Sequence, residues 1–402
     1  MRNRWSSPIT AAVAVAVSAA MQVVPALTQI LAVSPGTSVP SPALKTPWGE
    51  PDLQGIWTDE FDTPLQRPAK YADQELFTEA QREELDKERT EVLNRRAVGT
   101  PNDAYNFAVF LTTKRTGART SKIIDPPSGR IPSLTPETQK AAAADREFRL
   151  ALLQATDTCK NQLPACAGGK YDPMPSSRRA EAPPRYNAVN FGRINRHDGP
   201  EDGSLADRCL TGGLPEFGSA FGGSFRRIVQ TPGGVSMFYD VGQGEGWQRN
   251  IIMDGSPHLP SNIRQWYGDS RGHWEGDTLV IDVTNFSPKT DFQGSRENLH
   301  LVERWTRTGP TTMEYVVTLE DPTVWTQPWT VREEFTRQSD QENRIYYEPR
   351  CIEGNYGLPG FLHGRRMQER AFAEGRGIDP ATMDHIGALV STAAQAPPDP
   401  LQ

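Results

Sequence analysis

The sequence lacks the short motifs that identify several large enzyme classes. It contains no P-loop, no G-x-G-x-x-G after a predicted strand, no C-x-x-C-H haem attachment site and no H-E-x-x-H zinc motif. We therefore expect no phosphoryl transfer, nicotinamide chemistry, c-type haem binding or zincin proteolysis, and we expect no cofactor.

An excess of positive charge is also absent. Lysine and arginine together number 43 against 50 aspartates and glutamates, giving a formal net charge of -7, and the basic residues form no block. Proteins that bind nucleic acids need a basic patch to neutralise phosphates. The charge therefore argues against a nucleic-acid partner.

Long hydrophobic runs are absent except near the N-terminus. There, an uncharged stretch rich in alanine and valine, Ile9–Leu31, follows Arg2 and Arg4 and precedes the first acidic residue, Glu50. This pattern predicts an export signal over residues 1–33, with small residues at 18–20 as a cleavage site. The run is also long enough to span a bilayer, so a retained anchor is the alternative.

The rest of the chain is expected to be soluble and exported, to the periplasm or the medium. A linker rich in serine, proline and threonine covers residues 34–46, and no later stretch approaches the roughly 20 apolar residues of a membrane span. We therefore expect membrane contact only through an uncleaved N-terminal segment.

Only four cysteines are present. None has a C-x-x-C partner and no histidine lies at ligand spacing from another, so no metal site is expected. An even number of cysteines in an exported chain favours disulfides. We predict one bridge between Cys159 and Cys166 and a second between Cys209 and Cys351, which would tie the start of the β-region to its end.

Period-two alternation of apolar residues begins at Phe225 and predicts nine short strands with no helix between them. The predicted strands are Phe225–Gln230, Val235–Tyr239, Trp247–Met253, Asn262–Gly268, Thr278–Phe286, Leu299–Arg307, Met313–Glu320, Trp329–Arg337 and Arg344–Tyr347. The predicted fold class is mainly β with peripheral helices, an antiparallel meander that closes as a lipocalin-like barrel or folds as a sandwich. This β-domain is expected to span residues 186–360.

Residues 47–185 are predicted to form a first strand followed by a helical, loop-rich region. The strand Asp52–Trp57 contains a G-x-W sequence that resembles the first strand of lipocalin-like barrels, in which the tryptophan closes one end; a lone surface strand is the alternative. A second strand is expected over Ala118–Asp125. Pro164–Arg185 is expected to be a loop.

Three helices are predicted from their end signals. A capping box of Thr78 and Gln81 begins a charged surface helix that runs to Arg96. Thr135 before Pro136 begins a second helix that ends at about residue 154. The C-terminal part, residues 361–402, is expected to contain a polar helix over 365–374 and a disordered tail.

Three strings in the chain resemble a family of uncharacterised exported bacterial proteins. They are RTSKIIDPPSGRIPSLTPE at Arg119–Glu137, GDSRGHWEGDTLV at Gly268–Val280 and CIEGNYG at Cys351–Gly357. The resemblance covers about Thr46 to His363 and implies export, but no activity. Where that family often has a histidine after the late cysteine, this chain has Ile352, which argues against a metal or catalytic role there.

Alternation along two predicted strands places a glutamate among large apolar side chains. Glu303 shares a strand face with Trp305, and Glu333 shares one with Trp329. An unpaired buried carboxylate usually has a raised pKa, which suits a general acid. The alternative is an ion pair with an interior arginine such as Arg226, Arg249 or Arg304.

The remaining candidates lie near turns or next to these carboxylates. His258 and His300 are candidate catalytic residues of the β-region, with a satisfied surface histidine as the alternative. Trp305, Trp329, Tyr315 and Arg304 are candidate binding residues. Ser270 lies in a G-x-S-x-G pattern, but no helix follows, so a β-turn is expected rather than a nucleophile.

Three functions fit these observations. The first is a metal-independent acid–base enzyme, a hydrolase, lyase or isomerase acting on a small, partly apolar molecule. The second is a non-catalytic protein that binds such a molecule, with the two glutamates fixing its orientation. The third is a structural envelope protein with a filled core. Cations capping the two carboxylates would favour a scaffold, whereas open space between them would favour acid–base chemistry.

Overall fold

The computed structural model describes residues 44–59, 61–97, 114–188, 194–210, 213–217, 225–242, 245–339 and 356–384. The predicted signal or anchor, the predicted strand Arg344–Tyr347, Cys351 and the predicted tail beyond residue 384 lie outside these residues. The first part of that tail, residues 375–384, is described and contains a 3-10 helix, Pro380–Thr382. None of the helices within the described ranges is long and apolar enough to cross a membrane.

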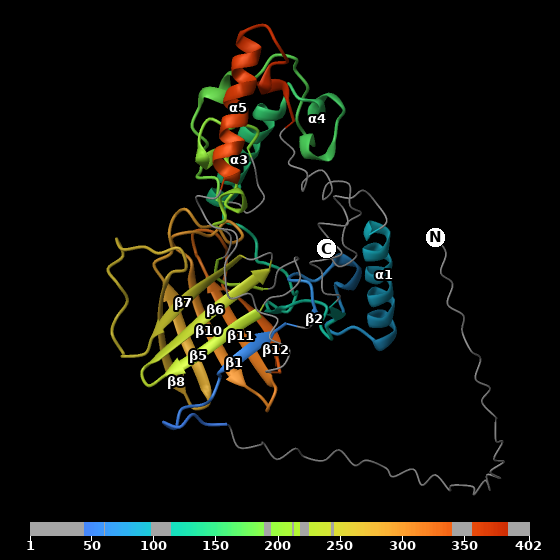
Figure 1. The fold of residues 1–402 in the computed structure, drawn as a ribbon. Coiled ribbons are helices and arrows are strands. Elements are labelled where there is room, and N and C mark those ends of the chain that lie inside the picture. Colours follow the sequence, from blue (N-terminus) through green and yellow to red (C-terminus); the bar gives the residue numbers. More distant parts are fainter. Residues whose placement is uncertain are drawn as a thin grey trace, which may run out of the picture. The chain divides into compact units, whose positions relative to one another are not determined.

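Nine strands form a closed barrel (Figure 1). Around the barrel they are β1 (Gly55–Thr58), β5 (Phe225–Thr231), β6 (Gly234–Gly242), β7 (Glu245–Ile252), β8 (Asp269–Glu275), β9 (Thr278–Thr284), β10 (His300–Arg307), β11 (Thr312–Glu320) and β12 (Trp329–Arg337). Pairing of β12 with β1 closes the ring. The predicted mainly β fold is confirmed, and its barrel form is the one adopted.

One pair of neighbours in the barrel is parallel. Ile252 of β7 pairs with Arg271 of β8 in parallel, whereas the other neighbouring strands are antiparallel. A ring with an odd number of strands cannot alternate direction throughout, so the otherwise antiparallel meander contains one parallel pair. Residues 253–268 connect the end of β7 to the start of β8, so that the two strands run in the same direction.

The segment Asn262–Gly268 is therefore a connection, and its prediction as a strand was wrong. At its end, Gly268 has φ +67°, and a Cβ there would lie 2.7 Å from the carbonyl oxygen of Thr284. The close approach to β9 and the positive φ both favour glycine. Ser270 follows within β8 and is buried, so the β-turn predicted for the G-x-S-x-G pattern was wrong too.

The first strand is part of the barrel wall. Trp57 of β1 is fully buried, and its indole N–H donates to the carbonyl oxygen of Leu53 at 2.8 Å. The guanidinium of Arg307 lies 5.6 Å from the centre of the Trp57 ring. A lone surface strand was therefore the wrong alternative, because this strand joins β5 to β12.

Alternating side chains from the strands fill the barrel interior. Trp305, Tyr315 and Phe335 form an aromatic cluster, with ring centres of Trp305 and Tyr315 4.2 Å apart. Glu303 and Glu333 lie on the same inward faces, as period-two alternation predicts, and both are buried. The core of the barrel is thus mainly apolar but contains charged groups.

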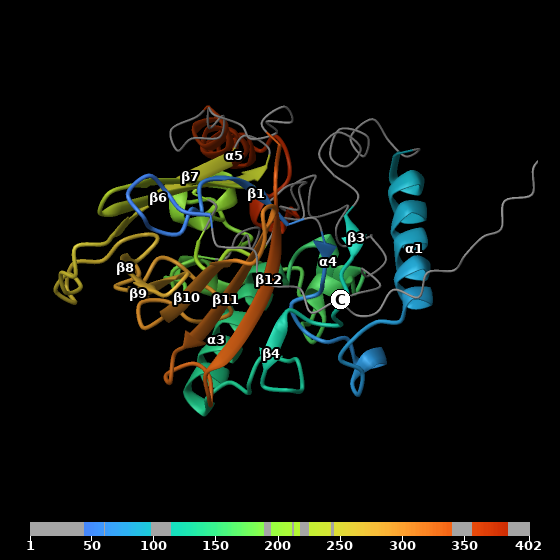
Figure 2. The ribbon, with the colours of Figure 1, turned by 90° about the horizontal axis from the view of Figure 1, so that it is seen from below.

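The remaining elements are short strands and helices. They are β2 (Phe61–Asp62), β3 (Arg115–Thr116), β4 (Ile123–Asp125), α1 (Glu79–Ala97), α3 (Pro136–Leu153), α4 (Asp157–Lys160) and α5 (Gly357–Ala373), with 3-10 helices η1 (Ala69–Tyr71), η3 (Pro164–Cys166), η4 (Ser177–Ala180), η5 (Pro200–Asp202), η6 (Ala206–Arg208) and η7 (Pro380–Thr382). Only the end of the predicted strand Ala118–Asp125 is a strand, β4, which lies beside β12 (Figure 2).

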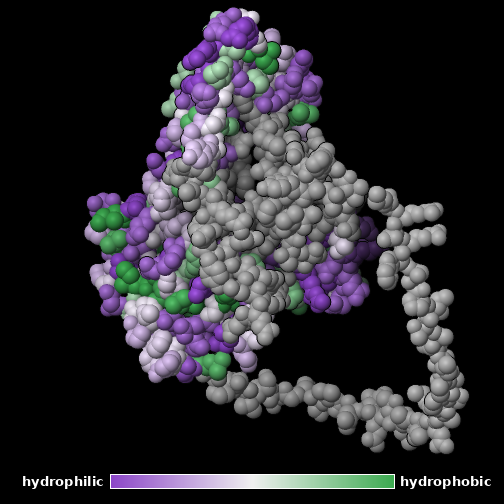
Figure 3. Space-filling model, in the orientation of Figure 1, coloured by the Kyte–Doolittle hydropathy of each residue, from purple (hydrophilic) through white to green (hydrophobic). Residues whose placement is uncertain are grey.

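The predicted end signals of two helices are present. The Thr78 hydroxyl accepts from the Gln81 N–H, and the Gln81 side chain accepts from the Thr78 N–H, which forms the capping box of α1. The Thr135 hydroxyl caps α3 by accepting from the Thr138 N–H. The visible part of α1 is hydrophilic, as expected of a surface helix (Figure 3).

Helix α5 begins earlier than predicted. It starts at Gly357, although the glycine-rich segment before Arg365 was expected to be a loop. The ring of Phe361 lies edge-on against His197, with ring centres 3.9 Å apart. This tertiary contact explains why the segment is helical in spite of the low helix propensity of its glycines.

One predicted disulfide is confirmed. Cys159 and Cys166 are bonded, with Cα atoms 5.1 Å apart. Cys209 is also disulfide-bonded. Its predicted partner, Cys351, lies outside the described residues, so the identity of the second bridge stays a prediction.

Candidate functional site

Strand β12 pairs with two different strands along one of its edges. At its start, Thr330 and Val331 pair with β4, whereas at its end Thr336 and Arg337 pair with β1. Between these two pairings, residues 333–335 pair with β11 on the other side only, among the strands that the structure describes. The side of β12 between β4 and β1 therefore forms a gap in the wall, which we call the gap.

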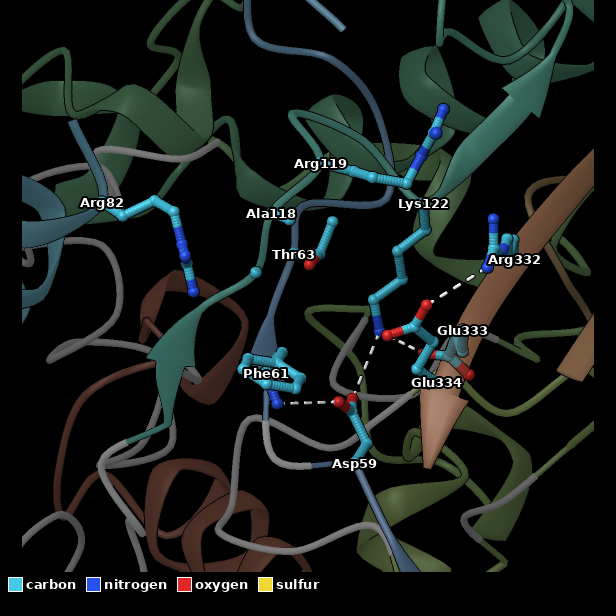
Figure 4. A pocket seen from close by; sticks show the side chains of 11 residues that line it. Asp59, Phe61, Thr63, Arg82, Ala118, Arg119, Lys122, Arg332, Glu333 and Glu334 are labelled. Carbon is cyan, nitrogen blue, oxygen red and sulfur yellow. Dashed lines mark hydrogen bonds and ion pairs between the residues drawn. The ribbon is translucent and has the colours of Figure 1, made fainter. Parts of the chain in front are cut away.

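A pocket lies at the gap (Figure 4). It is partly open to solvent and is lined by Asp59, Phe61, Thr63, Arg82, Gly117, Ala118, Arg119, Lys122, Arg332, Glu333 and Glu334. These residues come from β12, from Asp59 after β1, from β2 and the residue that follows it, from the segment before β4 and from α1. We call it the gap pocket.

A buried lysine connects the elements around the gap pocket. The Lys122 ammonium donates to Oε1 of Glu333, to the carbonyl oxygen of Phe217 at 2.5 Å and to Oδ2 of Asp59 at 3.5 Å. The backbone carbonyl of Lys122 accepts from the Arg332 N–H. Lys122 therefore fastens the segment before β4 to both sides of the gap, as Figure 4 shows.

This cluster is ionic. Burial alone would lower the pKa of Lys122, but the nearby carboxylates of Glu333 and Asp59 raise it above its ordinary value. Burial alone would raise the pKa of Asp59, but Lys122 and Lys114 lower it below its ordinary value. Lys122 therefore remains an ammonium at neutral pH and is no nucleophile or Schiff-base residue.

Glu333 has one unused oxygen. Its side chain is buried, and while Oε1 accepts from Lys122, Oε2 accepts no hydrogen bond from any residue in the described part of the chain. A buried polar atom without a partner costs about 1–3 kcal/mol, and more when it is charged. A bound molecule with a hydrogen-bond donor would remove this cost.

Glu303 lies in a different setting. One of its oxygens accepts from Arg249 Nη2 at 2.6 Å, and the other accepts from the Tyr315 hydroxyl at 2.8 Å. Burial tends to lower the pKa of Arg249, but the charge of Glu303 raises it. Burial, followed by the charge of Glu303, raises the pKa of Tyr315. Both oxygens of Glu303 are thus occupied, as the ion-pair alternative requires.

The other two arginines considered as partners of the glutamates, Arg226 and Arg304, form other contacts. Arg226 is buried, donates to the carbonyl oxygen of Glu216 and lies over the Phe335 ring at 4.6 Å. Arg304 lies on the outer face of β10 and pairs with Glu275 at 2.7 Å. Its side chain, 42% exposed, does not point into the barrel as a binding residue of the interior should.

The aromatic candidates pack inside the barrel. Trp305 and Tyr315 contact each other, whereas Trp329 packs edge-on against Trp325 with ring centres 5.4 Å apart. None of these lines the gap pocket. Of the candidate residues taken from the sequence, only Glu333 does so.

The candidate histidines meet on the outer face of the sheet. His258 lies 2.8 Å from Asp269 and, through its other ring nitrogen, 2.7 Å from Asp282. His300 lies 3.0 Å from the second oxygen of Asp282 and 3.2 Å from Glu320. Asp282 therefore joins both histidines in one hydrogen-bonded chain, which we call the outer chain. It lies on the opposite face of the sheet from Glu303.

Metal binding finds no support in this arrangement. No group of three or more histidine, cysteine, aspartate or glutamate side chains able to hold a metal ion occurs within the described ranges. Each ring nitrogen of His258 and His300 lies within hydrogen-bonding distance of a carboxylate oxygen.

Sequence reasoning missed Lys122 and Asp59. Lys122 lies in the first string shared with the exported family, and Asp59 follows directly after the strand that contains Trp57. Neither lies on one of the long alternating strands, so strand alternation gave no signal for them. Their role depends on the pairing of β1 and β4 with the same edge of β12.

The comparisons with known proteins do not assign this chain to a family. No family model matches the chain, and no curated protein matches it. Among solved structures, a point mutant of the fluorescent protein UnaG is similar over 29% of this chain and 73% of that one, with 16% sequence identity and a TM-score of 0.19. The description of the fold as a barrel therefore rests on the strand pairing of this chain.

Proposed function

We propose that this protein binds a small, partly apolar molecule in the gap pocket without transforming it. The observation that carries the proposal is the buried Oε2 of Glu333, which accepts no hydrogen bond from any residue of the described ranges and belongs to a residue that lines the gap pocket. The same side chain is held in place by Lys122 through its other oxygen. An acceptor that is fixed, buried and unused is suited to orient a ligand.

The pairing of the charged groups favours binding over acid–base catalysis. A general acid or base must exchange a proton near neutral pH. Glu303 is held between Arg249 and Tyr315, and Glu333 by a lysine whose pKa is raised. Each of the two carboxylates therefore already accepts a hydrogen bond from a buried cation. We therefore prefer the binding protein to the enzyme among the functions that the sequence left open.

The lining of the gap pocket fits a small ligand. Pockets for small molecules usually combine apolar surface with a few placed polar groups. In the gap pocket, Phe61 and Ala118 contribute apolar surface beside Glu333. A ligand with an apolar body and a polar end matches this arrangement.

Binding of an uncharged fluorescent dye, Nile red, tests the proposal. We expect saturable binding with one site per chain, and we expect Phe61→Ala to weaken it about fivefold or more, because an aromatic contact is lost. Phe372→Ala serves as the control, since Phe372 lies exposed on α5 and outside the gap pocket. Absence of saturable binding, or equal affinity in the Phe61→Ala variant, would overturn the proposal.

We further propose that the protein acts outside the cytoplasm, as the exported family that it resembles implies. The N-terminal pattern supports export, and the disulfide between Cys159 and Cys166 is compatible with an oxidising compartment. Fractionation of a bacterial host with mass measurement should find the protein in the periplasm or medium. A cytoplasmic protein with its full N-terminus would contradict this.

A further inference from the structure

We infer that the ligand of the gap pocket is a neutral molecule with a hydroxyl group, an alcohol or a phenol. The inference rests on the proposed function and gives the chemical class of the ligand. Three properties of the pocket carry it: the pairing of its buried charges, the pairing of the cations at its rim, and the kind of polar atoms left unused.

The charged groups at the inner end of the gap pocket are paired with one another. Lys122, Asp59 and Glu333 are buried, and Lys122 pairs with both carboxylates. Lys114, which is less buried, pairs with Asp59 at 3.4 Å. Against the larger effect of burial, the pKa of Asp59 is lowered by Lys122, then by Lys114 and then by Arg226, and that of Lys122 is raised by Glu333 and Asp59. A charged ligand would have to disrupt these buried pairs, which is costly.

The cations around the rim are already paired. Each of the three lining arginines forms an ion pair with a glutamate: Arg82 with Glu79 at 2.9 Å, Arg119 with Glu75 at 2.9 Å and Arg332 with Glu314 at 2.6 Å. An anionic ligand would have to compete with these carboxylates for the guanidinium groups. The rim therefore gives no advantage to a carboxylic or phosphoric acid over a neutral molecule.

The unused polar atoms require a group that both donates and accepts. Ionised Glu333 can only accept, so its Oε2 needs a donor from the ligand. Two lining residues, Arg119 and Arg332, each have a buried Nε that donates to no residue in the described ranges. A hydroxyl offers both a donor for the carboxylate and an acceptor for a guanidinium N–H, whereas an ether offers only an acceptor and an ammonium ion offers only donors.

A hydrogen bond to Glu333 would also distinguish an alcohol or a phenol from the corresponding ether. A hydrogen bond from a hydroxyl to a carboxylate is charge-assisted and about twice as strong as one between neutral groups. A methyl ether of the same shape would leave Oε2 without a partner and would add a methyl group at that point. The ether should therefore bind more weakly than the parent alcohol.

Competition for Nile red with four matched compounds tests the ligand class near neutral pH. They are para-butylphenol, its methyl ether para-butylanisole, the anion para-butylbenzoate and the cation para-butylbenzylamine. We expect the phenol to displace the dye at a concentration about tenfold or more below that of the ether, which is the effect of one well-made hydrogen bond to a charged group. The two ions should compete more weakly than the phenol.

A variant that removes the acceptor together with its cation tests the role of Glu333. Lys122→Met with Glu333→Leu avoids leaving a single charge buried, and the preference for the phenol over the ether should fall to about twofold or less while dye binding persists. Retention of the full preference would overturn the assignment of Glu333. If this double variant shows no cooperative melt, the comparison of the four compounds on the wild-type protein decides.

The outcomes separate the two proposals. If Nile red does not bind the wild-type protein, the proposed function fails and the ligand class falls with it. If the dye binds but the ether, the anion or the amine competes as well as the phenol, the ligand class is wrong while the binding function stands.

Discussion

Glu303 is a buried carboxylate that serves the barrel rather than the gap pocket. It lies at the centre of β10, pairs with Arg249 of β7 across the interior and accepts from Tyr315 of β11. Pairs of this kind are often no more stable than apolar replacements, but losing one partner leaves the other charge buried alone. This asymmetry leads to a test that needs no knowledge of the ligand.

We expect Glu303→Gln to lower the free energy of unfolding by about 3 kcal/mol or more, because Arg249 would remain charged and buried without a counter-ion. Urea unfolding followed by tryptophan fluorescence measures this. Glu147→Gln is the control, since Glu147 lies exposed on α3, and a surface change of this kind should stay within about 0.5 kcal/mol.

A second variant separates the ion pair from the loss of one group. Arg249→Met combined with Glu303→Leu should recover most of the stability lost in Glu303→Gln, because both charges leave the interior together. A loss below about 1 kcal/mol in Glu303→Gln would show that the interior around Arg249 is hydrated, contrary to its burial in the structure.

The sequence predicts the direction of these side chains better than their partners. Period-two alternation fixes which face of a strand carries Glu303 and Glu333, so both were found. Arg249 was named as one of three alternatives, because nothing in a strand pattern tells which cation crosses the barrel. Lys122 was missed because it comes from a short segment whose contact with Glu333 spans 211 positions of the chain.

At the scale of elements, β12 determines where the gap lies. Its edge is shared between β4 and β1, which come from a part of the sequence far before the main β-region. The sequence predicts that β1 and β4 are strands, but the order in which they add to β12 depends on the closure of the whole ring. The gap pocket therefore has no local signal in the sequence.

The outer chain joins the connection before β8 to three strands. His258 comes from the connection, Asp282 from β9, His300 from β10 and Glu320 from β11. The sequence showed that both histidines lie near turns, but their meeting at Asp282 follows from the register of β9 with β10 and from the path of the connection. These contacts make the stability of this face depend on pH.

The pKa of His300 is raised above its ordinary value of 6.5, first by its hydrogen bond to Asp282, against partial burial. Its contribution to stability is therefore fully present below about pH 6.5 and is lost as the pH rises through the raised pKa. The pKa of Asp282 is lowered below 3.8, first by the bond to His300, so its contribution is lost only as the pH falls through that lowered pKa. The pair should contribute most near pH 5.5.

We expect His300→Gln to reduce the free energy of unfolding by about 0.5 kcal/mol more at pH 5.5 than at pH 8.5, a small effect because both partners are a third or more exposed. Thermal melts at both pH values measure the difference. His363→Gln, at an exposed position of α5, should show no such pH dependence. An equal loss at both pH values would mean that the interaction does not depend on the charge of His300.

At the scale of the whole molecule, the period-two alternation of apolar residues predicted a mainly β protein, and the barrel confirms this. The direction of β8 was missed because the parallel pairing of β7 with β8 is set by ring closure and by the long connection between them, not by local propensity. Disulfides also affect the whole molecule, because they reduce the conformational entropy of the unfolded chain.

Closing a longer loop removes more entropy from the unfolded chain, so the two bridges should differ in strength. The bridge between Cys159 and Cys166 spans a separation of 7 residues, whereas the bridge that we predict between Cys209 and Cys351 encloses the barrel strands β5 to β12. We expect Cys166→Ser to cost about 2.5 kcal/mol and Cys351→Ser about 5 kcal/mol. Urea unfolding of the two variants measures both values.

Alkylation of the untreated protein followed by intact-mass measurement should detect no free thiol. Free thiols at Cys209 and Cys351, or an unchanged melting temperature in Cys351→Ser, would contradict the long-range bridge.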